Sequence, residues 1–313
     1  MIYFFYLKGG ESMEITWTCG EADEGRPVKD IARKRLHLSG ALWKRIKWNG
    51  IFSLNGQALH NAKTPVKTGD VLRFVWSEES DIIPSDIPLD ILYEDKDLLI
   101  VNKGPGMIIH PTSKEAHDTL VNAVAGYFRK KNEESGIHPV YRLDRNTTGL
   151  VVVAKSAKGQ YELSKSHDVL YREYLALVSG NMEGEGTIEA PIGRKPGSIV
   201  EWMVREDGKW AATEYKVLAS SEKVSLLRLH LLSGRTHQIR VHCTHLGHPL
   251  LGDTLYGGPL DLMDRQGLHA FTVAFNHPET GEKLYFKAPV PEDMKHIIST
   301  IWPDFDFTKE GLL

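Results

Sequence analysis

Residues 138–154 carry the sequence HPVYRLDRNTTGLVVVA, in which a polar segment passes directly into an unbroken apolar one. The apolar part, residues 150–154, is rich in β-branched side chains and follows Gly149, so it predicts a buried strand. Asp144 should therefore lie in a polar loop at the mouth of that strand, with an arginine close on either side. A carboxylate in such a place needs a cationic or hydrogen-bonding partner, because burying it unpaired is costly. If these residues stood alone, a structural ion pair that closes a loop would be the simpler explanation.

The order of residues around Asp144 follows a known signature. Arg142-Leu143-Asp144, followed at fixed spacing by Thr-Gly-Leu, resembles the catalytic motif of the RluA-type pseudouridine synthases, His-Arg-Leu-Asp-x-x-Thr-Ser-Gly-Leu. Tyr141 stands where that family has histidine, and Thr148 stands where it has serine. The aspartate and its neighbouring arginine are both in place.

Three other blocks of the chain are similar to the same family, and they occur in the same order. The segment from Lys103 to His110 resembles its Lys-Pro-x-Gly-x-x-x-His-Pro pattern, with the proline displaced by one position. Tyr174 opens a Tyr-Leu-Ala-Leu-Val-x-Gly strand, and residues 235–257 form the longest block. Together the blocks extend the resemblance over residues 25–302, whereas one block alone would not suffice.

Composition sets broad limits on the class of protein. The 313 residues allow one large domain plus a small one, and a net charge of −3 does not indicate a uniformly basic nucleic-acid binder. Cys19 and Cys243 are far apart, so we expect no disulfide framework and a reducing, cytoplasmic setting. The apolar residues 2–7 are too few to span a membrane and lack the flanks of a signal peptide. We therefore expect no membrane association and treat residues 1–12 as a tail.

Residues 14–76 are expected to form a small α+β domain of their own. Two helical segments carry interleaved basic residues, Ser39 can cap the second helix, and Asn55-Gly56 predicts a tight hairpin turn. This order resembles the S4 RNA-binding module, in which the basic helix faces would contact phosphates. An ordinary small domain with solvated lysines would explain the same pattern.

The rest of the chain is expected to divide into a linker, a catalytic domain and a tail. Residues 77–86 open with a polar, acidic run that is typical of a linker. Residues 87–302 would form the catalytic domain, and residues 303–313 a C-terminal tail. The resemblance implies that the catalytic domain has an α+β pseudouridine synthase fold with a mixed, largely antiparallel sheet.

Four helices are predicted in the catalytic domain. Residues 119–131 and 158–170 have helical periodicity, and a short helix follows Pro291 and ends at Ile301. The third helix runs through residues 235–247, where Thr236 can cap its start and Gly247 fits its end.

The resemblance implies catalytic roles for three residues. Conversion of uridine to pseudouridine breaks a C–N glycosidic bond and makes a C–C bond to the same base, which must first leave the RNA stack. Asp144 matches the essential aspartate of the family, which either attacks the ribose or removes a ribose proton. We assign Arg235 as its ion-pair partner, because an opposite charge within about 4–6 Å keeps a carboxylate ionised. Tyr174 matches the tyrosine that lies against the target base, although a tyrosine in a strand also commonly fills a core.

Four more residues are expected to bind the substrate. Arg142 would occupy the stack that the base vacates, since its planar guanidinium can stand in for a base. Arg240 would contact phosphate or support the loop, Ile239 would line the pocket, and His110 would help to bind the RNA. The partner implied is RNA, with large-subunit ribosomal RNA the commoner substrate in the family and tRNA close behind. We expect neither a metal nor a cofactor, because the reaction needs no redox partner and no energy source. We also expect the protein to be a monomer.

Two other functions fit parts of the sequence. His237, His242, His245, His248 and Cys243 could suggest a zinc hydrolase. However, His237 and His242 would lie on different helix faces, and no acidic base separates His242 from His245. A non-catalytic RNA-binding or ribosome-assembly protein would use the same binding modules, but it would not need the full set of catalytic residue types.

Overall fold

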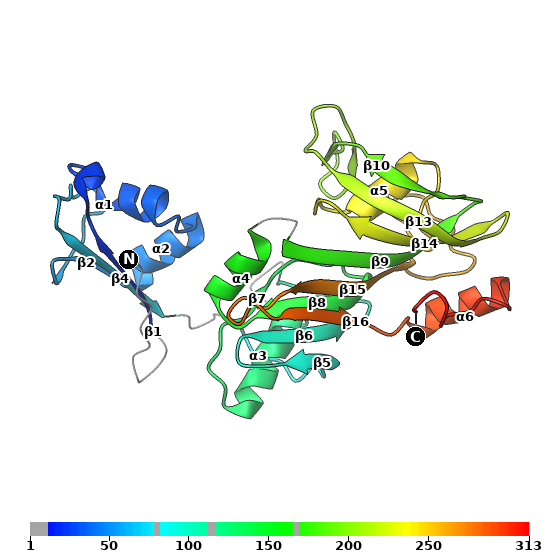
Figure 1. Cartoon of the computed structure of the whole chain (residues 1–313), viewed down its shortest axis with the longest axis horizontal. Helices are drawn as coiled ribbons and strands as arrows, with labels where there is room; N and C mark the ends of the chain where they lie inside the picture. Colours follow the sequence, from blue (N-terminus) through cyan, green and yellow to red (C-terminus); the bar gives the residue numbers. More distant parts are fainter. Residues whose placement is uncertain (1–11, 78–81, 112–116, 166–168, 313) are drawn as a thin grey trace. The chain divides into compact units, whose positions relative to one another are not determined.

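The computed structural model describes residues 12–77, 82–111, 117–165 and 169–312 (Figure 1). The chain separates into two compact units, residues 1–81 and 82–313. The expected N-terminal tail lies outside the described residues except for its last position. None of the described helices is long and apolar enough to cross a membrane.

The first unit is a four-stranded antiparallel sheet packed against short helices. The strand order is β1-β4-β2-β3. Its elements are β1 (Ser12–Thr18), the 3-10 turn η1 (Glu21–Asp23), α1 (Val28–Asp30), the π-helical turn η2 (Ile31–Arg35), α2 (Gly40–Asn49), β2 (Ile51–Leu54), β3 (Gln57–Ala58) and β4 (Val71–Ser77).

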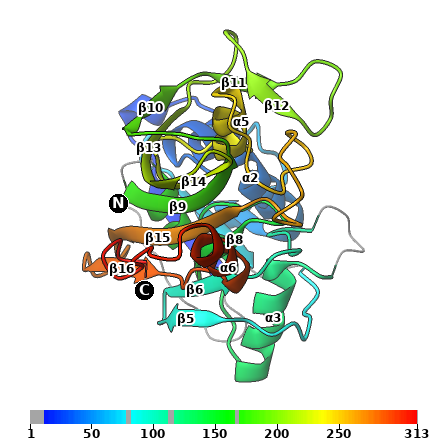
Figure 2. The same cartoon turned by 90° about the vertical axis from the view of Figure 1, so that its right-hand side faces the viewer.

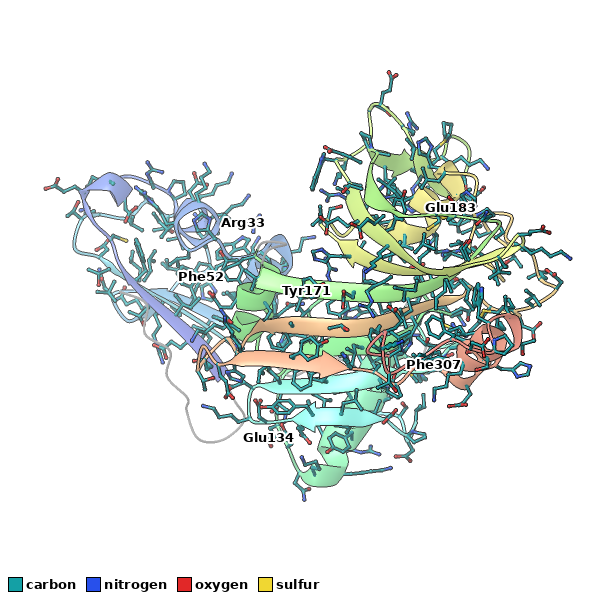
Figure 3. All side chains as sticks on the ribbon, turned by 45° about the vertical axis from the view of Figure 1, so that its right-hand side comes forward. Arg33, Phe52, Glu134, Tyr171, Glu183 and Phe307 are labelled. Carbon is teal, nitrogen blue, oxygen red and sulfur yellow. The ribbon has the colours of Figure 1, made fainter. Side chains whose placement is uncertain are left out.

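Local sequence signals set the ends of these elements. Ser39 caps α2, because its Oγ accepts a hydrogen bond from the Leu42 amide at 3.1 Å. Asn55 and Gly56 have φ values of 50° and 82°, the left-handed backbone that a two-residue hairpin turn requires. Both predictions are confirmed. In Figure 3, Phe52 lies in the core of this unit, whereas Arg33 lies on its helical surface.

Strand β1 was not predicted from the sequence. It pairs with β4 along its whole length, from Ser12 opposite Ser77 to Thr18 opposite Val71. Its sequence alternates polar and apolar residues, with Met13, Ile15 and Trp17 at every second position, so the strand pattern was present and was overlooked. The alternation within β1 and its pairing with β4 together make this segment a strand.

The second unit is built on one ten-stranded sheet (Figure 1). Its order is β10-β13-β14-β9-β15-β8-β6-β5, with β16 beside β15 and β7 beside β8. Among the described strand pairs, β15 and β8 are parallel and the others are antiparallel, which confirms the predicted α+β class with a mixed, largely antiparallel sheet. The strands are β5 (Ile91–Glu94), β6 (Leu98–Lys103), β7 (His138–Pro139), β8 (Thr148–Ala154), β9 (Leu170–Ser179), β10 (Glu185–Glu189), β13 (Ala212–Ser220), β14 (Val224–Leu231), β15 (Leu268–Asn276) and β16 (Lys283–Lys287). A separate hairpin is formed by β11 (Ile192–Arg194) and β12 (Trp202–Val204).

Helices cover both faces of this sheet. On one face, α3 (Leu120–Lys131) and α5 (Gln238–His245) share a core with Val101 and Val151, and Figure 2 shows the sheet curling around α5. On the other face, α4 (Ala157–Ser164) packs against Ile100 and α6 (Glu292–Ile301) packs against Leu177. Because successive strand residues point to opposite faces, fully apolar strands serve both layers.

The structure corrects the ends of two predicted helices. Helix α4 ends at Ser164 and does not reach residue 170, because Leu170 already belongs to β9. Helix α5 begins at Gln238, its N-cap is His237 in the left-handed conformation, and no side chain caps it, so Thr236 is not the cap. Gly247, with φ of 84°, follows the end of α5 as predicted.

Residues 303–313 are not the free tail that we expected. Leu312 is 1% exposed and packs in a core cluster with Met294 and Val290. Arg228 donates a hydrogen bond to the Glu310 carbonyl, and Lys287 donates one to the Gly311 carbonyl. The buried leucine holds this segment against the sheet.

The register of the central strands aligns three parts of the chain. Tyr174 on β9 lies opposite Leu229 of β14 on one side and Ala270 of β15 on the other. Ala270 in turn pairs with Gly149, at the start of β8, so the segment after Asp144 enters the sheet two strands from Tyr174. A β-carbon at position 149 would lie 2.2 Å from the Ala270 carbonyl oxygen, and φ there is +104°, so only glycine fits.

We expect Gly149→Ala to lower the free energy of unfolding by roughly 3 kcal/mol, because it combines a backbone clash with a strained φ. Denaturant unfolding of the full chain measures the change. Gly104→Ala is the matched control, since nothing lies within 4 Å of its added β-carbon. A Gly149→Ala variant as stable as this control would mean that the β8–β15 approach is not fixed.

Candidate active site

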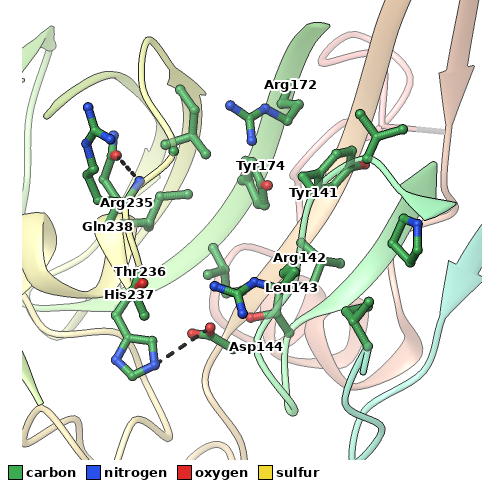
Figure 4. Close-up of a pocket in the computed structure, with 18 of the residues that line it drawn as sticks. Tyr141, Arg142, Leu143, Asp144, Arg172, Tyr174, Arg235, Thr236, His237 and Gln238 are labelled. Carbon is green, nitrogen blue, oxygen red and sulfur yellow. Dashed lines mark hydrogen bonds and ion pairs between the residues drawn. The ribbon is translucent and has the colours of Figure 1, made fainter. Parts of the chain in front are cut away.

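A cavity of about 670 Å³ opens in the second unit, where the Asp144 loop, β9 and the start of α5 meet (Figure 4). Every residue to which the sequence analysis gave a catalytic or substrate-binding role lines it: His110, Arg142, Asp144, Tyr174, Arg235, Ile239 and Arg240. These residues come from four segments that are far apart in the chain, and the sheet register brings the segments together.

Arg240, in the first turn of α5, is the cation that contacts Asp144. Its Nη1 donates to Asp144 Oδ2 at 2.8 Å, while its Nε and Nη2 hold Asp253 at 2.7 and 2.8 Å. The side chains of Arg240 and Asp253 are buried, whereas that of Asp144 remains 27% exposed. Burial disfavours the charged guanidinium, yet the hydrogen bonds and charge of Asp253, followed by those of Asp144, raise the pKa of Arg240 above its ordinary value.

His237 faces the second oxygen of Asp144. Its Nε2 lies 3.7 Å from Asp144 Oδ1, and its Nδ1 lies 2.8 Å from the Tyr256 hydroxyl. That hydroxyl already accepts a hydrogen bond from the Trp202 amide, so we assign its proton to the bond with Nδ1. Burial lowers the pKa of His237 and favours the neutral ring, despite the opposing charge of Asp144. The hydrogen on Nε2 is therefore directed toward Asp144.

The loop that carries Asp144 is anchored by three buried side chains of the core. Lys103 Nζ, Arg265 Nη1 and Gln266 Nε2 donate to the three residues that follow Asp144, at 3.0, 3.3 and 2.8 Å. The Thr147 amide also donates to the Asp144 carbonyl at 3.1 Å, which closes a turn. The carboxylate is thus held in place through its backbone as well as through Arg240.

Tyr174 and Ile239 form an apolar wall of the cavity, and each is 4% exposed. Burial raises the pKa of the Tyr174 phenol; the nearby Arg172 charge acts to lower it and the Asp144 charge acts to raise it. Tyr174 is therefore a neutral aromatic surface between two charged groups. This position agrees with both alternatives stated above for a tyrosine in a strand, because the ring fills the core and also lines the cavity.

Arg235 does not pair with Asp144, so that assignment was wrong. Its Nε donates to the Trp210 carbonyl at 2.9 Å. Because α5 begins only at Gln238, Arg235 lies in the turn before the helix, and Arg240 occupies the helical position beside Asp144. Arg240 therefore supports the loop, which was one of its two expected roles.

Arg142 and His110 lie at other parts of the cavity wall. Arg142 is exposed on the loop that carries Asp144. Burial lowers the pKa of His110, and the charge of Arg142 adds to this effect. Their expected contacts with RNA stay a prediction.

Sequence reasoning missed four residues of the site: Lys103, Arg172, His237 and Asp253. Three of them stand inside the family blocks, so the blocks located them without indicating a role. For Arg172 the available signal was its spacing, since it lies two residues before Tyr174 on a strand and therefore on the same face.

The histidines that suggested a zinc site have separate hydrogen-bond partners. His242 contacts the Thr213 hydroxyl through Nδ1 at 2.9 Å and the Ala190 carbonyl through Nε2 at 3.0 Å. His248 contacts the Ser179 carbonyl at 2.8 Å. These contacts account for the two histidines as structural residues.

Another group of potential metal ligands lies in the described part of the chain: Asp95 and Asp97 are in the β5–β6 turn, and His277 follows β15. Nδ1 of His277 accepts hydrogen bonds from the amides of Glu279 and Thr280 at 3.2 and 3.1 Å. We therefore assign the ring proton to Nε2, which donates to Asp95 at 3.1 Å. This tautomer has no lone pair left for a metal, so the group is a clamp between two turns.

Comparisons with known proteins identify the family of the chain. Residues 97–245 match the family described as RNA pseudouridylate synthase. The chain is 39% identical over 278 residues to the uncharacterized RNA pseudouridine synthase YjbO of Bacillus subtilis, covering 87% of this chain and 98% of that protein. It is 37% identical over 302 residues to ribosomal large subunit pseudouridine synthase D of Vibrio cholerae, covering 90% and 93%. The chain belongs to the RluA-type RNA pseudouridine synthase family.

A solved structure supports the same conclusion for the fold. The human RNA pseudouridylate synthase domain containing 1 protein matches with a TM-score of 0.53 and 29% identity, over 66% of this chain and 84% of that one. The synthase is therefore an isomerase that acts on RNA, and the catalytic interpretation is confirmed over the non-catalytic one.

The stability of the synthase should depend on pH through Lys103. Burial, assisted by the Arg265 charge and opposed by Asp144, lowers the pKa of Lys103 from 10.5 to about 7. Between these pH values the unfolded chain binds more protons than the folded one, so the free energy of unfolding rises with pH. The contribution of neutral Lys103 to stability is therefore complete above pH 10.5 and is lost as the pH falls to 7. The free energy of unfolding should rise by about 1 kcal/mol per pH unit in this window.

Lys103→Met should remove that rise, because the methionine has no proton to lose. Chemical unfolding at pH 7, 8 and 9 compares this variant with the wild type and with the exposed-lysine control Lys223→Met. Parallel stability curves for all three proteins would contradict a neutral Lys103 in the core.

Proposed function

We propose that the synthase uses Asp144 as its reactive carboxylate, on a uridine of large-subunit ribosomal RNA. The observation that supports this most is the ion-pair set Asp253–Arg240–Asp144, in which two members are buried and Asp144 alone is 27% exposed at the cavity. Arg240 attracts and orients this carboxylate, while Asp253 compensates part of the buried positive charge.

The proposed reaction begins when the target uridine leaves the stack and its base lies against Tyr174. Arg142, exposed on the neighbouring loop, fills the gap left in the RNA. Asp144 then attacks C1′ or removes a proton from C2′, and the C1′–N1 bond breaks with its electron pair going to the base. After the base turns, C5 bonds to C1′ as Asp144 leaves C1′ or returns the proton to C2′. The C5 proton is then lost and N1 gains one. Tyr174 is the group best placed to assist the loss of the C5 proton.

The proposal of large-subunit ribosomal RNA as the substrate is based on two similar proteins. Ribosomal large subunit pseudouridine synthase D of Vibrio cholerae and of Escherichia coli are each 37% identical to this chain, which covers 93% and 84% of them. A substrate in large-subunit ribosomal RNA is therefore favoured over tRNA. A monomer in the cytoplasm is the simplest setting for this activity.

The first unit would bind the same RNA away from the target base. Lys44, Arg45 and Lys47 are exposed on α2, and Trp48 beside them is 74% exposed. Lys47 Nζ lies 4.8 Å from the centre of the Trp48 ring. Exposed cations and an exposed aromatic ring can supply phosphate contacts and base stacking together.

Asp144→Asn should leave a folded protein that binds RNA and makes no detectable pseudouridine. The amide keeps the shape of the carboxylate but is a poor nucleophile and a poor base, and no neighbouring group can replace it. Asp144→Glu should be almost as inactive, because near-attack geometry tolerates little displacement. Release of tritium from C5-labelled RNA measures the activity on large-subunit ribosomal RNA and on tRNA.

Asp261→Asn, an exposed carboxylate in the same unit, is the control and should keep full activity. Turnover by well-folded Asp144→Asn would refute the role of Asp144. Activity of the wild type on tRNA alone would refute the ribosomal substrate while leaving that role intact.

Removal of residues 1–81 should leave a folded second unit that binds RNA more weakly, since this boundary separates the two compact units. The lost cations should also make the logarithm of affinity fall less steeply with the logarithm of salt concentration. Filter binding of both proteins between 50 and about 200 mM salt tests this. Equal salt slopes would argue against RNA binding by the first unit.

A further inference from the structure

Arg172 is a buried cation inside the active-site cavity, and none of the described residues forms an ion pair with it. It is 8% exposed and lines the cavity, and its buried Nε has no hydrogen-bond partner. The other two buried arginines behave differently: Arg240 and Arg265 each hold an aspartate through Nε and Nη2. A buried charge without a partner is costly, so a cation left in this state calls for an explanation by a ligand.

Packing holds the Arg172 side chain in the cavity. Its guanidinium carbon lies 5.4 Å from the centre of the Tyr141 ring. The Tyr141 hydroxyl donates to the Leu150 carbonyl at 2.8 Å, so this ring is fixed to β8. Tyr141 thereby supports Arg172 without neutralising it, and this is the position where the family motif has histidine.

Arg172 is placed to meet the target base. It lies two residues before Tyr174 on β9, so both side chains project from the same face at a spacing of roughly 7 Å. In Figure 4, Tyr174 lies between Arg172 and Asp144. A base held against Tyr174, with its ribose at Asp144, would therefore direct its far edge toward Arg172.

We propose that Arg172 stabilises the negative charge that develops on the uracil when its bond to the ribose breaks. The inference depends on the proposed roles of Asp144 and Tyr174. When the C1′–N1 bond breaks, its electron pair stays on N1 and is delocalised onto the two carbonyl oxygens, so the detached base is an anion. The charge disappears when C5 bonds to C1′, C5 loses its proton and N1 is protonated.

A charge that exists only during the reaction explains why Arg172 has no resident counter-ion. A permanent carboxylate beside it would cancel its effect on the departing base, whereas a fixed cation in a water-poor site needs no reorganisation when the charge appears. An RNA phosphate is a poorer candidate, because exposed cations contact phosphates, whereas Arg172 is buried in the cavity wall.

The test separates chemistry from binding in Arg172→Gln. With enzyme in excess over saturating RNA, the first-order rate of pseudouridine formation should fall by ~10²–10³-fold, as it does on loss of one oxyanion donor. The dissociation constant for RNA should change by less than about 3-fold. Arg172→Lys keeps the charge and should lose less. Arg129→Gln, an exposed arginine on α3 outside the cavity, should match the wild type.

A second substrate tests the charge itself. With 5-fluorouridine at the target position, the fluorine withdraws electrons, so the detached base needs less stabilisation. C5 of this base has no proton to lose, so the reaction ends when C5 bonds to C1′ and water adds at C6. The measured quantity is therefore the rate at which the starting nucleotide disappears. For Arg172→Gln this rate should be closer to that of the wild type than it is with uridine. A structural role would give the same ratio for both RNAs.

Three results would overturn the proposal. One is a rate for folded Arg172→Gln within about 3-fold of the wild type while Asp144→Asn stays inactive. Another is weaker RNA binding by Arg172→Gln with an unchanged rate at saturating RNA. If the slope of log affinity against log salt concentration were also lower by about one, Arg172 would be a phosphate contact. The third is an equal loss of rate on both RNAs. If Arg172→Gln does not fold, Arg172→Lys undergoes the same comparison. Failure of the wild type to form pseudouridine would instead refute the proposed function.

Discussion

The second unit depends on one buried guanidinium. Arg240 joins α5 to the loop after α5 through Asp253, and to the loop before β8 through Asp144. A buried arginine with both partners in place is tolerable, but loss of one partner from a buried pair costs about 3–5 kcal/mol. The Asp253 contact is bidentate and fully buried, so it fixes the plane of the guanidinium. Asp144 then receives one N–H in a set direction and keeps its other oxygen turned toward His237.

This arrangement requires each central strand to pair in one exact register. A slip of one residue in β9 would turn Tyr174 away from the cavity and bring Leu175 into its place. The register is protected by the contrasting surroundings of the two faces, because Leu175 packs with α6 whereas Tyr174 packs with the core around α3 and α5. Gly149 adds a steric lock where β8 meets β15. The geometry of the site is thus a consequence of core packing.

The sequence predicted the strand after Gly149, the strand that contains Tyr174 and helix α3, because their apolar patterns are local signals. It also located the site, since each cavity wall contains a recognisable block. The pairing within the site could not be predicted: Arg235 and Arg240 stand in the same block, and the choice between them depends on where α5 begins. That start is set by His237 in a left-handed conformation, without a side-chain cap to mark it. The packing of Leu312 was missed for a similar reason, because distant partners stabilise it. Strand β1 is different, since its alternating Met13, Ile15 and Trp17 were a local signal that was overlooked.

Arg240 and Arg172 both line the cavity, but only the charge of Arg240 is neutralised by carboxylates. Arg240 is neutralised by two aspartates, so its charge is already committed in the free protein and serves to orient Asp144. Arg172 is held by the neutral ring of Tyr141, which fixes its position and leaves its charge uncompensated. An enzyme gains rate only from interactions that strengthen toward the transition state. A cation that already has a carboxylate partner changes little as the base departs. The attraction between an unpaired cation and the uracil grows as negative charge develops on the base. The packing of the surrounding core positions this cation before the reaction begins.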